Sequence, residues 1–253
     1  MWKSLLIAGA VVLGTAHAHA AELKLLVGGA MSEPFHEVAE AFEKRTGHHI
    51  AMTVDNTGAL QRRLKAGEKA DAILLASQGM DALEKENRIV PGTRVDLGRA
   101  VMAVVVRADA PAVDLSSVES FKQALLKARA VALTDPAGGG TAGVHMAHVM
   151  EQMGITAEMR PKIIYRTQGA FVTEAVVKGE ADLGVTFTSE IIPNKAAKVA
   201  GLLPSAVQSP TNYAAAILAG AASPDLAKSF LLEFKTPLAY EAIRKVGLEP
   251  LSK

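Results

Sequence analysis

The sequence contains no cysteine, and this absence removes several kinds of chemistry. Without cysteine the chain has no disulfide framework, no thiolate nucleophile and no cysteine-ligated zinc site. Aromatic residues make up 4% of the 253 residues, and the one tryptophan is Trp2. Because an aromatic cage for a quaternary ammonium ligand favours tryptophan, choline-type ligands are disfavoured.

The chain also lacks a large net charge of either sign. Its 27 basic and 26 acidic residues give a formal charge of +1. This balance provides no global field for a phosphate backbone or an anionic lipid surface, so no nucleic-acid partner is expected. The length suffices for one large or two small packed domains.

The N-terminus carries the features of a secretion signal. Lys3 precedes the apolar run 5–16, and a small-x-small pattern ends at Ala20. A membrane-spanning helix needs about 20 apolar residues, so we interpret residues 1–20 as a signal peptide cleaved near Ala20/Ala21. This predicts a periplasmic protein without stable membrane insertion.

After this signal, short apolar runs alternate with amphipathic segments. The strand-like run 23–27 is followed by two glycines and then by apolar residues with helical spacing, namely Phe35, Val38, Ala39 and Phe42. The same alternation recurs at 50–64, 72–83 and 131–150. Strands that alternate with helices predict an α/β fold, with helices flanking mixed, mainly parallel sheets.

Two longer extended runs, 100–106 and 213–218, flank the middle of the chain. They predict a double crossover between two lobes. We expect lobe 1 to comprise residues 21–105 and 208–253, and lobe 2 to comprise residues 106–207. The loops at the carboxyl ends of parallel strands would then face each other across a cleft, where a ligand is expected.

A glycine-rich loop at residues 135–143 stands between an expected strand and an expected helix. Its backbone N–H groups and the helix N-terminus suit a carboxylate or a tetrahedral oxyanion. The loop lacks the lysine and the spacing of a nucleotide P-loop, so ATP is not expected there. A turn that merely starts a helix is the alternative interpretation.

Three further turns have the same character, at 28–32, 55–58 and 165–169. Four helix N-termini pointing into one cleft would form an anion site without net basic charge. Arg62 and Arg166 are the basic residues nearest to these turns, and an arginine fork binds a carboxylate bidentately. For Arg62, a solvated helix face is the alternative.

Metal and nucleophile sites find less support. His145 and His148 are three residues apart on one expected helix, and we expect them to be packing or surface histidines. Neither an HExxH motif nor a GxSxG nucleophile elbow is present. We therefore expect no metal and no cofactor.

Four short stretches carry a family resemblance. They are Gly28-Gly29-Ala30-Met31, Lys65–Ala72, Asp135-Pro136 with Thr141-Ala142-Gly143, and Gly179–Val185. Together they resemble the molybdate-binding branch of the type II periplasmic solute-binding proteins, over nearly the whole mature length. The resemblance implies two lobes that close on a small anion, and usually delivery of the anion to an ABC permease.

The chain departs from what that resemblance implies for molybdate. The hydroxyl-bearing ligands of the molybdate receptors correspond here to Ala30 and Phe187, which lack a hydroxyl, and to the neighbourhood of Thr57. Each missing charged hydrogen bond to a buried dianion costs roughly 1.5 to 3 kcal/mol. We therefore expect the ligand to be a di- or tricarboxylate.

The predicted site draws on all four turns. The expected ligand contacts are Gly29, Ala30, Met31, Thr57, Gly58, Arg62, Thr141, Ala142, Arg166, Gln168, Gly169 and Phe187. Aconitate isomerase, a periplasmic enzyme with a tricarboxylate substrate, is similar to the same branch, so an isomerase stays open beside a transport receptor. Its allylic proton shift needs a general base, for which Glu33, His145, Tyr165 and Tyr213 are undecided candidates.

Overall fold

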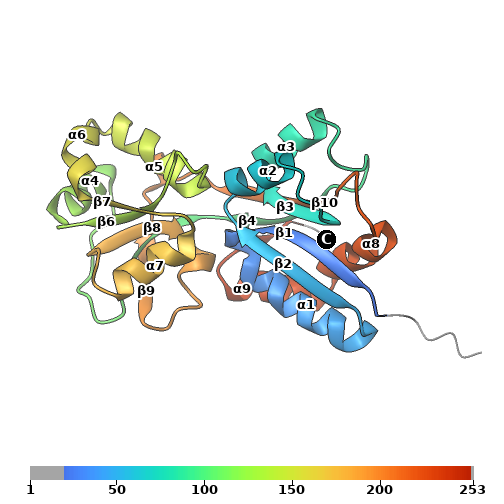
Figure 1. Cartoon of the computed structure of the whole chain (residues 1–253). Coiled ribbons are helices and arrows are strands. Elements are labelled where there is room, and N and C mark those ends of the chain that lie inside the picture. The colour runs from blue at the N-terminus through green and yellow to red at the C-terminus, as the bar shows by residue number, and fades with distance from the viewer. Residues whose placement is uncertain (1–19, 252–253) are drawn as a thin grey trace, which may run out of the picture.

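The computed structural model of the chain describes residues 20–251, so the expected signal peptide lies outside it except for its last residue. The described residues form two lobes, each built on one sheet with helices on both faces (Figure 1). Two mixed sheets with flanking helices confirm the predicted α/β class. Within residues 20–251, no helix is long and apolar enough to cross a membrane.

The first sheet has six strands in the order β11-β4-β10-β3-β1-β2. Its strands are β1 (Glu22–Gly28), β2 (His49–Asp55), β3 (Ala72–Ala76), β4 (Val95–Ala100), β10 (Thr211–Ile217) and β11 (Glu249–Pro250). The pairs of β1 with β2 and β3 are parallel, and the other pairs are antiparallel. One face carries α1 (Ser32–Thr46), α8 (Pro224–Leu232) and α9 (Pro237–Lys245), and the other carries α2 (Thr57–Lys65) and α3 (Ser77–Lys85).

The second sheet has five strands in the order β7-β6-β8-β5-β9. Its strands are β5 (Met102–Arg107), β6 (Val131–Thr134), β7 (Ile163–Arg166), β8 (Leu183–Phe187) and β9 (Ala197–Leu202). The pairs of β6 with β7 and β8 are parallel, whereas β5 pairs antiparallel with β8 and β9. One face carries α4 (Val118–Lys127), α5 (Thr141–Gln152) and α6 (Thr156–Met159), and the other carries α7 (Gly169–Val177).

The predicted face of α1 is confirmed. Phe35, Val38, Ala39 and Phe42 are each at most 4% exposed. Phe35 packs against Phe230 of α8, with ring centroids 6.0 Å apart, as part of an aromatic cluster between the helices. This cluster holds α1 and α8 against the same face of the first sheet. The packing of α1 thereby fixes the position of the turn that precedes it.

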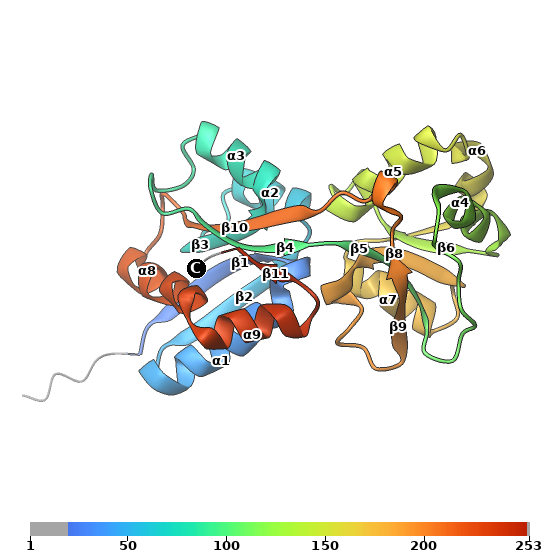
Figure 2. The ribbon, with the colours of Figure 1, turned by 180° about the vertical axis from the view of Figure 1, so that it is seen from behind.

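The chain crosses between the sheets twice (Figure 2). The run expected at 100–106 changes sheet at Val101, since β4 ends at Ala100 and β5 begins at Met102. The return crossing runs from β9 to β10. The side chain of Gln208 on this return bonds both backbone groups of Met102, at 3.1 and 2.8 Å. The two crossings are therefore tied to each other, while the predicted lobe limits stay predictions.

Candidate functional site

A small cavity lies between the lobes, where the strand-to-helix turns of both sheets meet. Its volume is about 30 Å³. It is lined by Gly28, Gly29, Asn56, Thr57, Thr134, Gly140, Thr141, Ala142, Phe187 and Tyr213. Backbone amides in the first turn of a helix have no intrahelical acceptor. Gly58 and Ala59 of α2 and Gly143 of α5 already donate to Gly139, Asn56 and Thr134, so the amides that these helix starts can offer the cavity are those of Thr57, Thr141 and Ala142. An anion between the lobes would meet donors from both.

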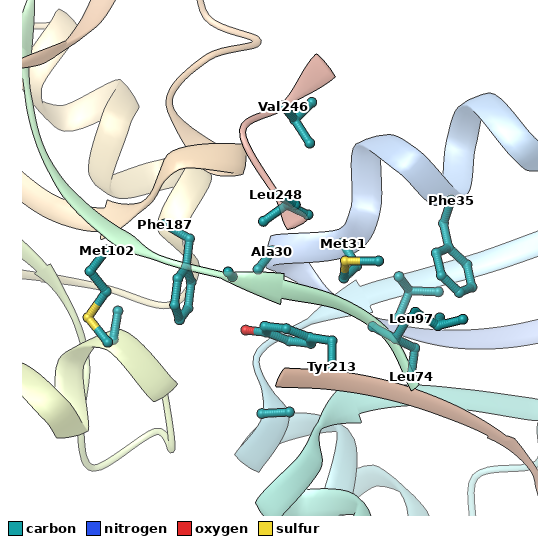
Figure 3. Close-up of a cluster of buried hydrophobic side chains, with 14 of the residues drawn as sticks. Ala30, Met31, Phe35, Leu74, Leu97, Met102, Phe187, Tyr213, Val246 and Leu248 are labelled. Carbon is teal, nitrogen blue, oxygen red and sulfur yellow. The ribbon is translucent and has the colours of Figure 1, made fainter. Parts of the chain in front are cut away.

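Tyr213 brings a hydroxyl group into the cavity from β10. The residue is 3% exposed, and its ring lies edge-on to Phe187 with centroids 6.0 Å apart (Figure 3). The Thr141 side chain, at the first residue of α5 in the opposite lobe, acts on this hydroxyl and opposes the rise of its pKa. Burial, and secondarily the charge of Glu190, raise the pKa of Tyr213 well above its usual value. The phenol therefore keeps its proton and remains a donor at neutral pH.

Glu190 is a buried carboxyl group behind the cavity wall that was not among the candidate bases expected from the sequence, although it is not itself one of the residues that line the cavity. It ends a 3₁₀ turn, Thr188–Glu190, that directly follows β8. Its Oε2 accepts hydrogen bonds from Thr186 Oγ1 at 2.5 Å and from the Phe187 amide at 3.4 Å, and the Gly169 amide is a third donor that acts on the carboxyl group. Burial raises the pKa of Glu190 above its usual value, against the opposing effect of these three bonds. The other turns were recognised from glycines after a strand, whereas no glycine follows β8 before Glu190.

Two glycines from different lobes make room for the Glu190 carboxylate. A Cβ atom on Gly169 would lie 1.9 Å from Oε2, and a Cβ on Gly29 would lie 3.0 Å from Oε1. A side chain at Gly169 would displace the carboxylate, because carbon and oxygen atoms do not approach so closely. The carboxylate thus lies between Gly29 of the cavity wall and Gly169, the first residue of α7.

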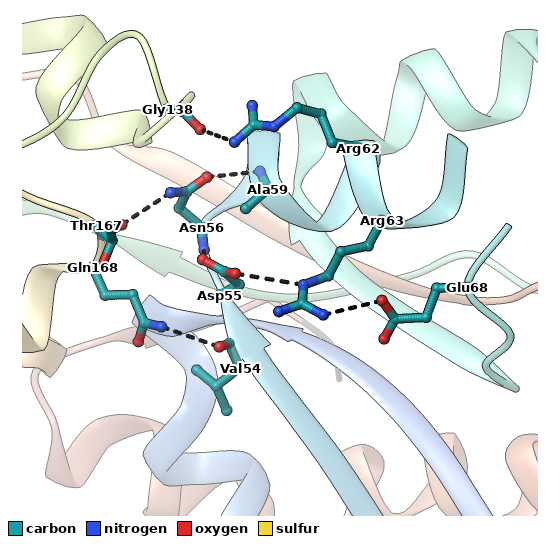
Figure 4. A network of polar contacts seen from close by, with 10 residues as sticks. All are labelled: Val54, Asp55, Asn56, Ala59, Arg62, Arg63, Glu68, Gly138, Thr167 and Gln168. Atoms are coloured by element: carbon teal, nitrogen blue, oxygen red, sulfur yellow. Dashed lines mark hydrogen bonds and ion pairs between the residues drawn. The ribbon is translucent and has the colours of Figure 1, made fainter. Parts of the chain in front are cut away.

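Amide side chains bridge the lobes at one edge of the cleft (Figure 4). Asn56 donates to the carbonyl of Thr167 at 2.9 Å, and Gln168 donates to the carbonyl of Val54 at 3.1 Å. Gln168 was expected to contact the ligand, but in this closed arrangement it bonds the opposite lobe. Its amide stabilises closure.

The adjacent arginines of α2 also have partners in the protein. Arg62 donates to the Gly138 carbonyl of the other lobe at 3.0 Å (Figure 4). Arg63 pairs with Glu68 at 3.1 Å and with Asp55 at 3.6 Å. Arg62 was expected to bind a carboxylate of the ligand, and the structure instead has it bridging the lobes.

Arg166 does not reach the cavity. Its guanidinium pairs with Glu180 and donates to the carbonyl of Tyr165 at 3.0 Å. Arg166 was expected in the cleft because it ends a strand, but its side chain pairs with Glu180, an acidic residue beyond α7. Arg166 is therefore not among the residues that line the cavity, and its contact with a ligand stays a prediction.

Three of the four candidate bases lie away from the cavity. Glu33 is exposed on α1, and Tyr165 is 47% exposed on β7. Neither lines the cavity. His145 lies outside it as well, and its Nε2 is 2.7 Å from the Val207 carbonyl. Among the four candidates, Tyr213 lies at the cavity.

The structure brings several expected ligand contacts to the cavity wall. They are Gly29, Thr57, Thr141, Ala142 and Phe187. Ala30 and Met31 are instead buried in the neighbouring core (Figure 3). Gly58 lines a wider groove beside the cavity, and the Gly169 amide is bonded to Glu190. Among residues 20–251, no three His, Asp or Glu side chains are grouped so as to hold a metal ion.

A family comparison agrees with this geometry. The model of the bacterial extracellular solute-binding proteins matches residues 23–249. The chain belongs to this family. The resemblance seen in the sequence is thereby confirmed for this solute-binding protein.

Its curated relatives include an enzyme and receptors. The chain is 32% identical to an aconitate isomerase of a Pseudomonas species, across 96% of this chain and 95% of that protein. It is 30% identical to a molybdate-binding protein of Rhodobacter capsulatus, across 94% of this chain and 92% of that protein. These two relatives differ in activity, so the family by itself does not choose between catalysis and transport.

Solved structures share the fold of this solute-binding protein. The periplasmic molybdate-binding protein of Azotobacter vinelandii matches with a TM-score of 0.73 at 21% identity. The match covers 91% of this chain and 100% of that one. A sulfate-binding protein of Mycobacterium tuberculosis matches with a TM-score of 0.70 at 16% identity, over 91% of this chain and 87% of that one. Identities this low establish the two-lobed fold alone.

The burial of Glu190 has a consequence for the stability of this solute-binding protein. A carboxyl group whose folded pKa lies above the unfolded value binds more protons in the folded state, so its contribution to stability is lost as the pH rises through the folded pKa. The unfolded value is close to 4.5. The melting temperature of Glu190→Gln, measured relative to wild type, should therefore increase as the pH rises from 4 to 8. Thermal unfolding at several pH values measures this, and a difference that does not change with pH contradicts it.

Proposed function

We propose that this solute-binding protein is a periplasmic isomerase of an unsaturated tricarboxylate, which converts trans-aconitate to cis-aconitate. The observation that carries the proposal is Glu190, a buried carboxyl group directly behind the cavity wall, with its Oε1 3.0 Å from the position of a Cβ on the lining residue Gly29. The isomerase relative, 32% identical over nearly the whole chain, supports it. The signal-like segment at 1–20 supports the compartment.

A buried carboxyl group favours an enzyme over a receptor at this site. An anion receptor gains affinity from donors, and a negative charge beside its ligand opposes binding. Proton abstraction next to a carboxylate is favoured by a base with a raised pKa, and desolvation raises the pKa of Glu190. A carboxylate that weakens the binding of an anion can therefore act as the base of the reaction.

The reaction is a proton shift along three carbon atoms. Glu190 takes a proton from the methylene carbon, and the electron pair of that C–H bond moves into the conjugated carboxylate. The same carboxyl group returns a proton to the far allylic carbon, so the double bond moves and no other reagent is consumed. The Tyr213 hydroxyl and the first-turn amides of α2 and α5 donate to the enolate-like oxygen atoms.

The test is incubation of the purified protein with trans-aconitate in deuterium oxide. Cis-aconitate should form, with deuterium at carbon wherever the Glu190 proton exchanges with solvent. Proton NMR follows both the isomer ratio and the label. A protein that binds aconitate but leaves the isomer ratio unchanged after hours is not an isomerase.

A receptor for an organic polycarboxylate, serving an ABC permease, is the second candidate. The bridging bonds of Asn56 and Gln168 favour it, because lobes that close around a ligand are what a receptor needs. Ala30 and Phe187 disfavour molybdate in this role too, since neither side chain offers a hydroxyl. Calorimetry with trans-aconitate, citrate and molybdate distinguishes these ligands.

A further inference from the structure

A polar groove runs beside the small cavity, between α2 and α3 of one lobe and α5 of the other. Its volume is about 720 Å³. Ser209 and Pro210 of the return crossing, and Thr211 and Asn212 at the start of β10, lie along it. Its polar lining side chains include Gln61, Ser77, Gln78, His145, His148 and Asn212.

The groove is an extension of the cavity. Thr57 and Thr141, the first residues of α2 and α5, line both spaces. The cavity of about 30 Å³ has room for a group the size of two or three water molecules, which need about 10–15 Å³ each. Pockets for small ligands measure about 300–1,000 Å³, a range that includes the groove and excludes the cavity.

The groove has unused hydrogen-bond donors. Asn212 accepts from Arg99 through Oδ1 at 3.1 Å, which leaves its amide N–H groups directed elsewhere. Gln61 uses one N–H on the Gly79 carbonyl at 3.2 Å, and its second is left over. No Asp or Glu is among the residues that line the groove, so no side-chain carboxylate there would repel an anion.

We infer that this groove is the subsite for the carboxylates that the cavity does not hold. One carboxylate of the substrate lies at the cavity, and the rest of the molecule extends past Thr57 and Thr141 into the groove. This assignment rests on the proposed tricarboxylate function. It makes the groove the part of the site that distinguishes a tricarboxylate from a small oxyanion.

Filling the groove tests the assignment. Val144 lines it from α5 and is 39% exposed, so Val144→Trp adds bulk there without opening the core. The matched control is Gln152→Trp, an exposed position at the end of the same helix and away from the groove lining. For trans-aconitate, Val144→Trp should raise both Kd and KM at least about tenfold, whereas Gln152→Trp should match wild type.

A charge change tests it without adding bulk. Gln78 is exposed on α3 and lines the groove. At low ionic strength, Gln78→Glu should raise the Kd of trans-aconitate about fivefold and Gln78→Lys should lower it by a similar factor, as expected for one charge at close range in water. Both changes should shrink in high salt.

The outcomes separate the two proposals. Wild-type turnover with KM unaltered in Val144→Trp and in both Gln78 variants overturns the groove and leaves the isomerase. A wild-type protein that neither binds nor isomerises trans-aconitate overturns the proposed function, and the groove assignment with it. Selective loss of affinity in Val144→Trp, with opposite effects of the two charges at Gln78, supports the groove.

Discussion

Glu190→Gln should isomerise trans-aconitate about 10² to 10⁴ times more slowly than wild type, the usual contribution of a general base. Glutamine has the same shape, and its carbonyl oxygen can accept the hydrogen bonds that Thr186 and Gly169 donate to Glu190. Its amide cannot take a proton from carbon. KM should stay constant or fall, because the variant removes a negative charge beside an anionic substrate. Steady-state kinetics by ultraviolet absorbance or NMR measures both parameters.

The matched control for this variant is Glu174→Gln on α7. Glu174 pairs with Lys178 at 3.1 Å on the exposed surface, so its loss should leave kcat unaltered. A wild-type rate in Glu190→Gln would show that another group removes the proton. An equal loss in both glutamine variants would point to a general effect on folding, which melting temperatures detect.

Gly58→Ala is expected to weaken ligand binding at least about tenfold by preventing full closure of the lobes. A Cβ on Gly58 would lie 2.7 Å from the Gly139 Cα and 2.8 Å from the Gly138 carbonyl oxygen, both backbone atoms of the other lobe. Carbon atoms pack at about 3.5–4.0 Å, so the lobes must separate. Calorimetry measures the affinity, and solution scattering measures the separation.

The fold of each lobe should tolerate the change at Gly58. The residue lies inside α2, where alanine is favoured over glycine by about 1 kcal/mol, so the melting temperature should hold or rise. Gly220→Ala is the control, because a Cβ there meets no atom within 4 Å. Wild-type affinity in Gly58→Ala would show that the close approach of Gly58 and Gly139 is not needed for binding.

Much of the fold could be predicted because its determinants are local. The apolar spacing of Phe35, Val38, Ala39 and Phe42 indicates one buried helix face, and the structure buries all four. Alternating apolar runs and glycine turns likewise predicted an α/β protein of two sheets. The change of sheet at Val101 was not predictable, because an apolar extended run looks the same whichever sheet its residues join.

The sequence predicted where the turns around the candidate site lie, but not the positions of the titratable side chains beside it. Glycines after strands located the turns of the cavity, since a turn is specified by neighbouring residues. Glu190 gave no such signal, because its role depends on the Gly169 amide and on Gly29 from the other lobe. Tyr213 remained one candidate among four until β10 placed its ring against Phe187.

The sequence by itself determined the alternation of strands and helices, the glycine turns at the strand ends and the absence of hydroxyl groups at Ala30 and Phe187. The tertiary structure alone decided which side chains are free for a ligand. Arg166 pairs with Glu180, and Arg62 bonds the Gly138 carbonyl of the other lobe. The physical reason is that long side chains take partners from segments distant in the chain, whereas turns and periodic burial depend on residues a few positions apart.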